Sequence, residues 1–402
     1  MRDGYRAHPH EHRLDAIDPY NLKRVLEHVN DLRDLAGASA DIGFLRRARR
    51  ATLPLPVIDR RRAIDTDVFP PFRSRPLERL QGQRVAVVAT GGSGGCVALV
   101  GVARAFEEAG IRPALISCCS GSVIWGAMWA AGLSAQQMVD FSLSWRPEDY
   151  LDIQWLRLPR LALSALRDFS GLAKGAAVQR LFDAQTWARP VGALDIALST
   201  IVYNIDLGEV EYFGSAQTPE LTLGQLVRIG IALPLFVEAV EIGGHLYMDG
   251  GIVDLFPAQP VIDDASIDHV FGVNVMLPAQ FHPQDVTGWQ THRMGILRAS
   301  RQLQQGNHLE LARRSQRQLG ERLTLIDAVD PDLVRGVSFY DLFIDRSRWP
   351  ELMQLGYRSA RQVLDGMRSP TRVSGRRRAS AASAAGRSAP GTPRRARGRT
   401  PG

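Results

Sequence analysis

The part of the chain that most limits its fold is the segment 84–132, where short apolar runs alternate with small-residue turns and helical patterns. Val85–Val88 is an apolar run with the length of a buried parallel strand. Val97–Ala109 has helical spacing and precedes Gly110, a residue type that commonly ends helices. A second strand is expected at 113–117 and a second helix at 123–131. Because successive strand–helix units build a parallel sheet covered by helices, the segment predicts an α/β fold with a mostly parallel central sheet.

Composition divides the chain into three parts. Residues 1–80 are polar and rich in Arg, with a helical period at 21–35 and a proline-rich linker at 69–76. Residues 84–366 are expected to form the folded domain, and residues 367–402 a disordered, Arg-rich tail with too few apolar residues to offset the entropy of ordering. Within the domain we expect a mostly helical stretch at 134–190, strands at 198–204, 210–213 and 269–275, a hairpin at 236–248, and helices at 221–229, 284–320 and 350–366.

The basic character of the chain comes from its tail. The formal net charge is +7, but the ten arginines after Gly366 are accompanied by no acidic residue, which leaves the rest of the chain close to neutral. Nucleic acid binding is therefore not expected of the folded domain.

Cysteine usage and apolar patterning favour a cytoplasmic location. There are three cysteines, two of them adjacent, and this odd number disfavours a disulfide framework. The first 15 residues lack the apolar segment of a secretory signal. The uncharged stretch 113–139 is interrupted by serines and glycines, so we interpret it as a buried strand and helix rather than a membrane span.

Three short patterns point to chemistry, and the first is a glycine-rich turn between the first strand and helix. It consists of Thr90 followed by Gly91, Gly92, Ser93, Gly94 and Gly95. Backbone N–H groups of such a turn can bind an anion at a helix N-terminus, although a tight turn alone explains the pattern equally well. A nucleotide site is disfavoured, because no Lys-Ser/Thr pair follows and no carboxylate lies about 20 residues further on.

The second pattern is a serine between the second strand and helix. A nucleophile elbow places a serine on a strained turn, so the residues two before and two after it must be small. Ser120 satisfies this requirement, although a lone serine here is also a common helix N-cap. The other residues of the expected elbow are Cys118, Cys119, Gly121 and Ser122.

The third pattern, Asp249-Gly250-Gly251, would by itself indicate only a turn. Together the three patterns resemble the patatin-like phospholipase family. The resemblance rests on ATGGSGGCVALVGVARAFEEAGI at 89–111, ALISCCSGSVIWGAMWAAGLS at 114–134, YNIDLGEVEYF at 203–213 and LGQLVRIGIALPLFVEAVEIGGHLYMDGGIVDLFPAQPV at 223–261. It covers about residues 84–275.

The resemblance implies a three-layer fold and a serine–aspartate dyad. Ser120 would be the nucleophile and Asp249 its base, with the oxyanion held by N–H groups of residues 91–95 and the dyad loop formed by Gly250 and Gly251. The family uses neither cofactor nor metal. The implied substrate is a lipid ester, such as a phospholipid or lysophospholipid, with peripheral membrane contact.

The chain departs from the family pattern at two places. The elbow glycines of Gly-x-Ser-x-Gly are replaced by Cys118 and Ser122, and an arginine of the family's glycine loop is missing where Gly95 and Cys96 stand. A Cβ at a strained turn costs about 1–3 kcal/mol, so a weakened or inactive lipid-binding relative is the first alternative.

Other hypotheses remain at this stage. The chain order also permits an α/β-hydrolase with a Ser-Asp-His triad that uses His269 or His245. A non-catalytic protein that binds anionic lipid or nucleic acid through its tail, and a hydrolase of storage polyester, are further alternatives. The mixed apolar and basic residues at 150–184 suggest either a lid or an amphipathic core helix.

Overall fold

The structure is a computed structural model that describes residues 66–153, 171–186, 188–234, 236–277, 295–334, 342–343 and 346–368. The predictions for the helical period at 21–35 and for the tail after 368 lie outside the described residues, as does 154–170 of the expected helical stretch.

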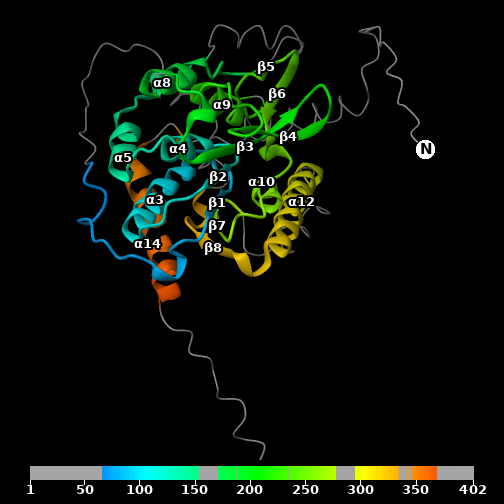
Figure 1. Ribbon diagram of the computed structural model, residues 1–402. Helices are drawn as coiled ribbons and strands as arrows, with labels where there is room; N and C mark the ends of the chain where they lie inside the picture. Colours follow the sequence, from blue (N-terminus) through cyan, green and yellow to red (C-terminus); the bar gives the residue numbers. More distant parts are fainter. Residues whose placement is uncertain are drawn as a thin grey trace, which may run out of the picture.

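An eight-stranded sheet forms the centre of the domain (Figure 1). Its hydrogen-bonded neighbours follow the path β5-β6-β3-β2-β1-β7-β8, and β4 also pairs with β3. The five strands from β3 to β8 along this path are parallel, whereas β4 and β6 are antiparallel to β3. The strands are β1 Val85–Ala89, β2 Leu115–Cys118, β3 Ala197–Asn204, β4 Glu209–Gly214, β5 Val240–Ile242, β6 His245–Asp249, β7 His269–Asn274 and β8 Leu323–Asp327.

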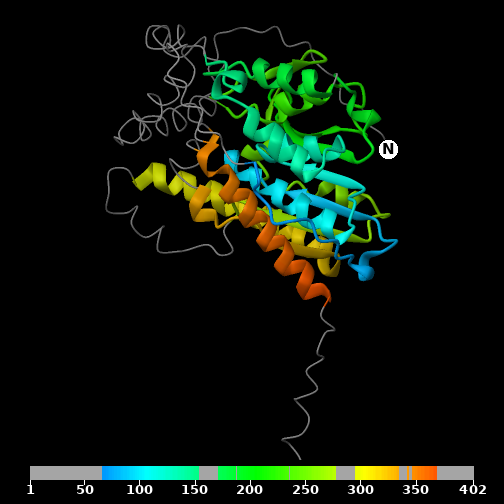
Figure 2. The same cartoon turned by 90° about the vertical axis from the view of Figure 1, so that its left-hand side faces the viewer.

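Helices cover both faces of this sheet, which makes three layers (Figures 1 and 2). One face is covered by α3 Ala98–Ala109, α4 Ser122–Ala130, α5 Ala135–Ser144, α8 Ala176–Thr186, α9 Leu223–Gly230 and α14 Trp349–Arg368, and the other by α10 Gln259–Asp263 and α12 Gly295–Leu319. Short α6 Pro147–Tyr150 lies beside α8. All five residues of β1 are buried, as expected for a strand with apolar layers on both sides. The predicted fold class is therefore confirmed.

Short 3-10 turns connect several of these elements. They are η1 Glu78–Leu80, η2 Ser93–Val97, η4 Val191–Ala193, η5 Gly250–Ile252, η7 Gly320–Arg322, η8 Pro331–Val334 and η9 Arg346–Arg348. Among the described residues, no helix combines the length and apolar character needed to cross a bilayer.

Where the structure describes them, the predicted strands and helices of the domain are found within a few residues of their expected bounds. Residues 284–294 of the helix expected at 284–320 lie outside the described residues. The short helix α10 was not predicted from the sequence, nor was the edge strand β8. Only Ile326 of its five residues is buried, so its sequence does not form the apolar run that marks the central strands. Its pairing with β7 depends on a partner more than 40 residues away along the chain, which a local pattern does not show.

Residues 66–80 were predicted to belong to the N-terminal extension, and they lie against the domain. Val68, Phe69 and Leu77 are buried. The backbone N–H groups of Arg75 and Leu77 donate to the carbonyls of Glu108 and Ala109, at 2.6 and 2.9 Å. Residues 70–77 have no regular secondary structure, as expected of a linker. They nevertheless pack along α3.

The helices α3 and α14 cross at very short range. A Cβ added at Gly101 would lie 1.9 Å from the carbonyl oxygen of Met353, and one at Gly356 would lie 2.0 Å from that of Ala98. Two glycines therefore let the backbones touch. Because α3 continues directly from the glycine-rich turn, α14 fixes the helix that supports this turn.

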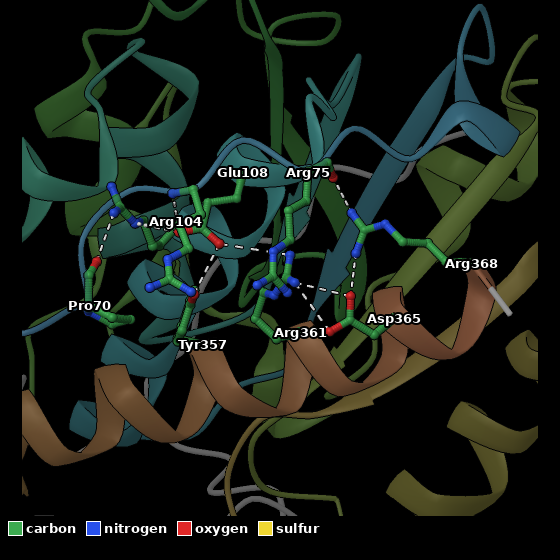
Figure 3. Close-up of polar contacts among 9 residues, drawn as sticks. Pro70, Arg75, Arg104, Glu108, Tyr357, Arg361, Asp365 and Arg368 are labelled. Atoms are coloured by element: carbon green, nitrogen blue, oxygen red, sulfur yellow. Dashed lines mark hydrogen bonds and ion pairs between the residues drawn. The ribbon is translucent and has the colours of Figure 1, made fainter.

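A buried ionic network joins the same two helices (Figure 3). Glu108 on α3 is 1% exposed and accepts a hydrogen bond of 3.0 Å from the Tyr357 hydroxyl on α14. Its carboxylate lies 3.4 Å from Nε of Arg104 and 3.8 Å from Nη1 of Arg361, which also pairs with Asp365 at 3.0 Å. The buried negative charge is thus compensated by two guanidinium groups.

Candidate active site

The carboxyl ends of β2 and β6 meet along one edge of β3. Cys118 lies opposite Thr200, and Asp249 lies opposite Val202. Strand β4 pairs with β3 along 199–204 and so occupies its other edge. Since β2 and β6 share the remaining edge and run in opposite directions, their ends face each other across about two residues, or ~7 Å. This topology brings together two chain segments that are far apart in the sequence.

Ser120 occupies the turn that leaves β2 at this junction. Its φ is +54°, one of three positive values among the described non-glycine residues. A side chain in this region is strained, and the strain is concentrated where β2 changes directly into α4. Ser120 is partly exposed, whereas Cys119 and Gly121 on either side are buried. The turn is therefore sharp and leaves Ser120 partly accessible to solvent.

The structure shows how the turn accommodates a serine at 122. The Ser122 hydroxyl is buried and accepts from the N–H of Cys119 at 2.9 Å. It lies 2.8 Å from the carbonyl oxygen of Cys119 and 3.2 Å from that of Ala89, to which it can donate. Ser122 begins α4 with ordinary helical conformation, so glycine is not required there. Through these contacts the buried Ser122 hydroxyl stabilises the turn.

Cys118 is accommodated by a glycine on the following helix. A Cβ added at Gly126 would lie 2.4 Å from the Cys118 Sγ. The thiol thus takes the space that a side chain at 126 would fill, and Cys118 itself is fully buried. The two elbow replacements are therefore built into the packing of α4, and the predicted clash at the turn is absent from this geometry.

Asp249 is fully buried at the end of β6. Its Oδ1 accepts from the N–H of Gly251 at 2.8 Å, while Oδ2 has no regular hydrogen bond to any described residue. Burial raises the pKa of Asp249 to about 6, and interactions with the Ser120 side chain and the Gly251 amide oppose that rise. The Ser120 side chain therefore lies close enough to Asp249 to lower its pKa, although the pair does not form a regular hydrogen bond. In enzymes without substrate, catalytic hydrogen bonds are often long or poorly aligned.

The glycine-rich turn lies directly against the elbow. A Cβ at Gly91 would lie 3.2 Å from the Ser120 Cβ, and one at Gly121 would lie 2.4 Å from the Ser93 carbonyl oxygen. Ser93 has φ +51° and Gly92 +158°, so the chain turns sharply here. No described residue accepts a hydrogen bond from the N–H groups of Gly92, Ser93 or Gly94, where η2 begins. Unpaired amides beside a partly exposed serine form a site suited to an anionic oxygen.

The cysteines near this junction are free and fully buried. Burial raises the pKa of Cys96 and Cys119 well above the usual value and that of Cys118 to about 12. Because the thiolate is the nucleophilic form, these thiols are poorly suited to attack a substrate.

Two titratable residues near the site, Asp254 and His308, were not singled out from the sequence. Burial raises the pKa of Asp254, five residues after Asp249, to about 6. His308 on α12 is buried and lies 3.2 Å through Nε2 from the carbonyl oxygen of Ile252, just past the Asp-Gly-Gly turn. A histidine in the middle of a long polar helix carries no local signal that would single it out. Among the described residues, no three metal-binding side chains come together.

The two histidines considered for a triad lie away from Ser120. His269 is opposite Val85 at the amino end of the parallel strands, four residues or ~13 Å before the level where β1 ends. His245 begins β6, also ~13 Å along the strand from Asp249, and it pairs with Asp206 at 3.8 Å. The triad hypothesis with either histidine is therefore wrong.

Comparison with known proteins fits this geometry. Residues 87–262 match the family described as patatin-like phospholipase. The chain contains a patatin-like phospholipase domain. The match begins in β1, ends in α10 and includes the glycine-rich turn, the elbow and the Asp-Gly-Gly turn.

Solved structures similar to this patatin-like chain share little sequence with it. VipD from Legionella pneumophila is 14% identical, with 76% of this chain and 72% of that chain covered and a TM-score of 0.41. Human GIVD cytosolic phospholipase A2 is 12% identical, with 82% and 64% covered and a TM-score of 0.42. ExoU, in its complex with SpcU from the type III secretion system of Pseudomonas aeruginosa, is 14% identical, with 73% and 52% covered and a TM-score of 0.36.

Proposed function

We propose that this protein hydrolyses lipid acyl esters, with Ser120 as nucleophile and Asp249 as the base that activates it. The observation that carries the proposal is the unpaired Oδ2 of a buried carboxylate at the junction where β2 and β6 meet, beside a partly exposed serine on a strained turn. Burying a carboxylate without a cation beside it lowers the stability of the fold, and such groups are found most often at functional sites.

The first step would be attack of the Ser120 oxygen on the ester carbonyl. The hydroxyl proton moves to Oδ2 of Asp249 as the bond forms, while the Gly251 amide keeps the carboxylate oriented through Oδ1. An aspartate with a pKa of about 6 is a better proton acceptor than one at the usual value, yet it stays ionised at neutral pH. Burial thus tunes the base for this transfer.

The negative charge that develops on the carbonyl oxygen would be received by the free amides of Gly92, Ser93 and Gly94. Oxyanion donors of this kind are typically worth about 3 kcal/mol each in the transition state. The protonated Asp249 then returns its proton to the departing alcohol. A water molecule, activated by the same carboxylate, attacks the acyl-enzyme and releases the fatty acid with Ser120 restored.

The family match supports a lipid ester as the substrate, because the family is described as patatin-like phospholipase. A phospholipid or lysophospholipid is accordingly the proposed substrate, reached by a cytoplasmic protein at the surface of a membrane. No step of the mechanism requires a cofactor.

The test is hydrolysis of a soluble short-chain acyl ester and of a phospholipid by the purified full chain. We expect turnover of both by the wild type and loss of turnover in Ser120→Ala. The control is Ser266→Ala, an exposed serine near the amino end of β7, which should keep wild-type rates. Equal turnover in Ser120→Ala and wild type would reject the proposal.

A further inference from the structure

Exposed apolar side chains gather at the end of two neighbouring hairpins. Among the described residues, six large hydrophobic side chains are more than a third exposed. Four of them lie on the β3–β4 hairpin and at the start of β6, and we call them the hairpin tip: Ile205, Leu207, Val210 and Leu246, with exposed fractions of 37, 56, 38 and 40%. Scattered exposed leucines are ordinary on a protein surface, but this concentration is not.

The hairpin tip lies on the carboxyl side of the sheet, where Ser120 is. The N–H of Ile205 donates to the Leu246 carbonyl at 2.8 Å, so the two hairpins lie side by side (Figure 1). Along β3, Ile205 is three residues past Val202, the residue opposite Asp249. The hairpin tip therefore extends ~10 Å beyond the level of the dyad, on the side away from β2. A surface that contacts it would be close to the active site.

The charges around the hairpin tip are acidic. Asp206, Glu209 and Glu241 are exposed, and segments 203–213 and 240–249 contain no lysine or arginine. Nδ1 of His245 lies 3.8 Å from the carboxylate of Asp206. An anionic membrane or polyanion would be repelled by these carboxylates, whereas an electrically neutral lipid surface imposes no such cost. The pattern differs from a polybasic membrane anchor and depends on apolar contact instead.

We propose that the hairpin tip is the docking surface for an electrically neutral, zwitterionic lipid surface, which it holds next to the active-site junction. The proposal rests on the proposed function for its choice of a lipid partner. It assigns binding to residues outside the catalytic machinery, so that docking and chemistry can be separated by experiment.

The experiment measures binding of the full chain to phosphatidylcholine vesicles by flotation in 0.5 M salt, which suppresses contacts of the Arg-rich tail. The test variant is Leu207→Ser/Leu246→Ser. The matched control is Leu325→Ser, an equally exposed leucine on β8 at the opposite edge of the sheet. In addition, Leu207→Trp reports directly on the environment of the hairpin tip through its fluorescence.

We expect at least tenfold weaker vesicle binding for the double variant, wild-type binding for Leu325→Ser, and a blue shift of Leu207→Trp emission on vesicles. Hydrolysis of a soluble ester should be unchanged in the double variant, which also verifies folding. Equal binding of wild type and double variant, or equal losses in the test and control variants, would overturn the proposal. So would an apolar patch that only mediates dimerisation, seen as a shift in gel filtration.

Failure of the proposed function gives a different result. A chain that binds vesicles through the hairpin tip but hydrolyses no ester would retain the docking surface and lose the assigned chemistry. A chain that hydrolyses the soluble ester but binds vesicles independently of residues 207 and 246 would retain the chemistry and lose the docking surface.

Discussion

Asp249 and Glu108 are both buried carboxylates in one domain, and their surroundings are opposite. Glu108 is enclosed by Arg104, Arg361 and the Tyr357 hydroxyl between α3 and α14 (Figure 3). Asp249 accepts a hydrogen bond from one backbone amide, and among the described residues no cation pairs with it and its Oδ2 has no hydrogen-bond partner. The same chemical group is neutralised by partners at one place and left available at the other.

The difference distinguishes a buried charge that stabilises the fold from one that can take part in a reaction. A carboxylate whose oxygens are paired with guanidinium and hydroxyl groups holds two helices together and offers no free oxygen to a further hydroxyl. A carboxylate with an unpaired oxygen and a raised pKa lowers the stability of the fold, and it can receive the proton of a neighbouring hydroxyl.

The largest expected effect comes from replacing Asp249. Asp249→Asn keeps the shape and the Gly251 contact but cannot accept the serine proton, so kcat/KM for a soluble ester should fall by about 10³-fold or more. Thermal stability should be kept or increased, because a buried charge is removed. Steady-state kinetics and a thermal melt check both expectations, and a variant with near-normal kcat/KM would contradict the assignment of the base.

Glu108→Gln should show the reverse behaviour. It removes the carboxylate from between Arg104 and Arg361, of which Arg361 keeps its pair with Asp365. Removing one partner from a buried ionic contact typically costs about 3 kcal/mol of unfolding free energy. Denaturant unfolding measures this loss, while kcat per folded molecule should stay near the wild-type value. If Glu108→Gln kept full stability and lost turnover, the contrast between the two carboxylates would be mistaken.

The pH dependence should follow Asp249. Because the base must be ionised, kcat/KM should rise with pH up to about pH 6 and then level off. The pKa of Asp249 in the folded state, about 6, exceeds the usual 3.8. Between these two pH values the native state therefore binds a proton that the unfolded state has lost. Stability from this residue is therefore greatest below pH 4 and is lost as pH rises through 6, by about 3 kcal/mol. Asp249→Asn should remove this component, and an unchanged pH–stability profile would count against it.

The smallest effect concerns the fit between Cys118 and Gly126. Gly126→Ala adds a methyl group where the Cys118 Sγ lies, and overpacking of this kind costs about 1–3 kcal/mol. Cys118→Gly should recover most of that loss in the double variant, as measured by a double-mutant cycle. Gly366→Ala, at a helical glycine with open space, is the control and should be neutral or slightly stabilising. Additive losses would show that the two positions are independent.

The local patterns predicted the elements that carry the site, but not how they meet. The apolar run at β1, the C-terminal Gly110 of α3 with φ +67° and the small residues around Ser120 are properties of short segments, and the expected elements appear there. The end-to-end approach of β2 and β6 depends on which edges of β3 are occupied, a property of pairing at long sequence separation. Proximity of Ser120 and Asp249 could be proposed from the family resemblance alone.

The remaining gaps in the prediction have similar causes. The costs expected for Cys118 and Ser122 were judged from the turn alone, and the space left by Gly126 and the hydrogen bonds of the Ser122 hydroxyl are tertiary features. The role of Glu108 was not visible either, because two of its partners, Tyr357 and Arg361, come from a helix about 250 residues later.

The most direct measurement is the rate and position of labelling by a fluorophosphonate that reacts with activated serines. In the wild type we predict a single adduct on the peptide that contains Ser120, formed at the same rate in Glu108→Gln and at least a hundredfold more slowly in Asp249→Asn. An adduct on a different serine, or labelling of Asp249→Asn at the wild-type rate, would contradict the claim that Asp249 activates Ser120.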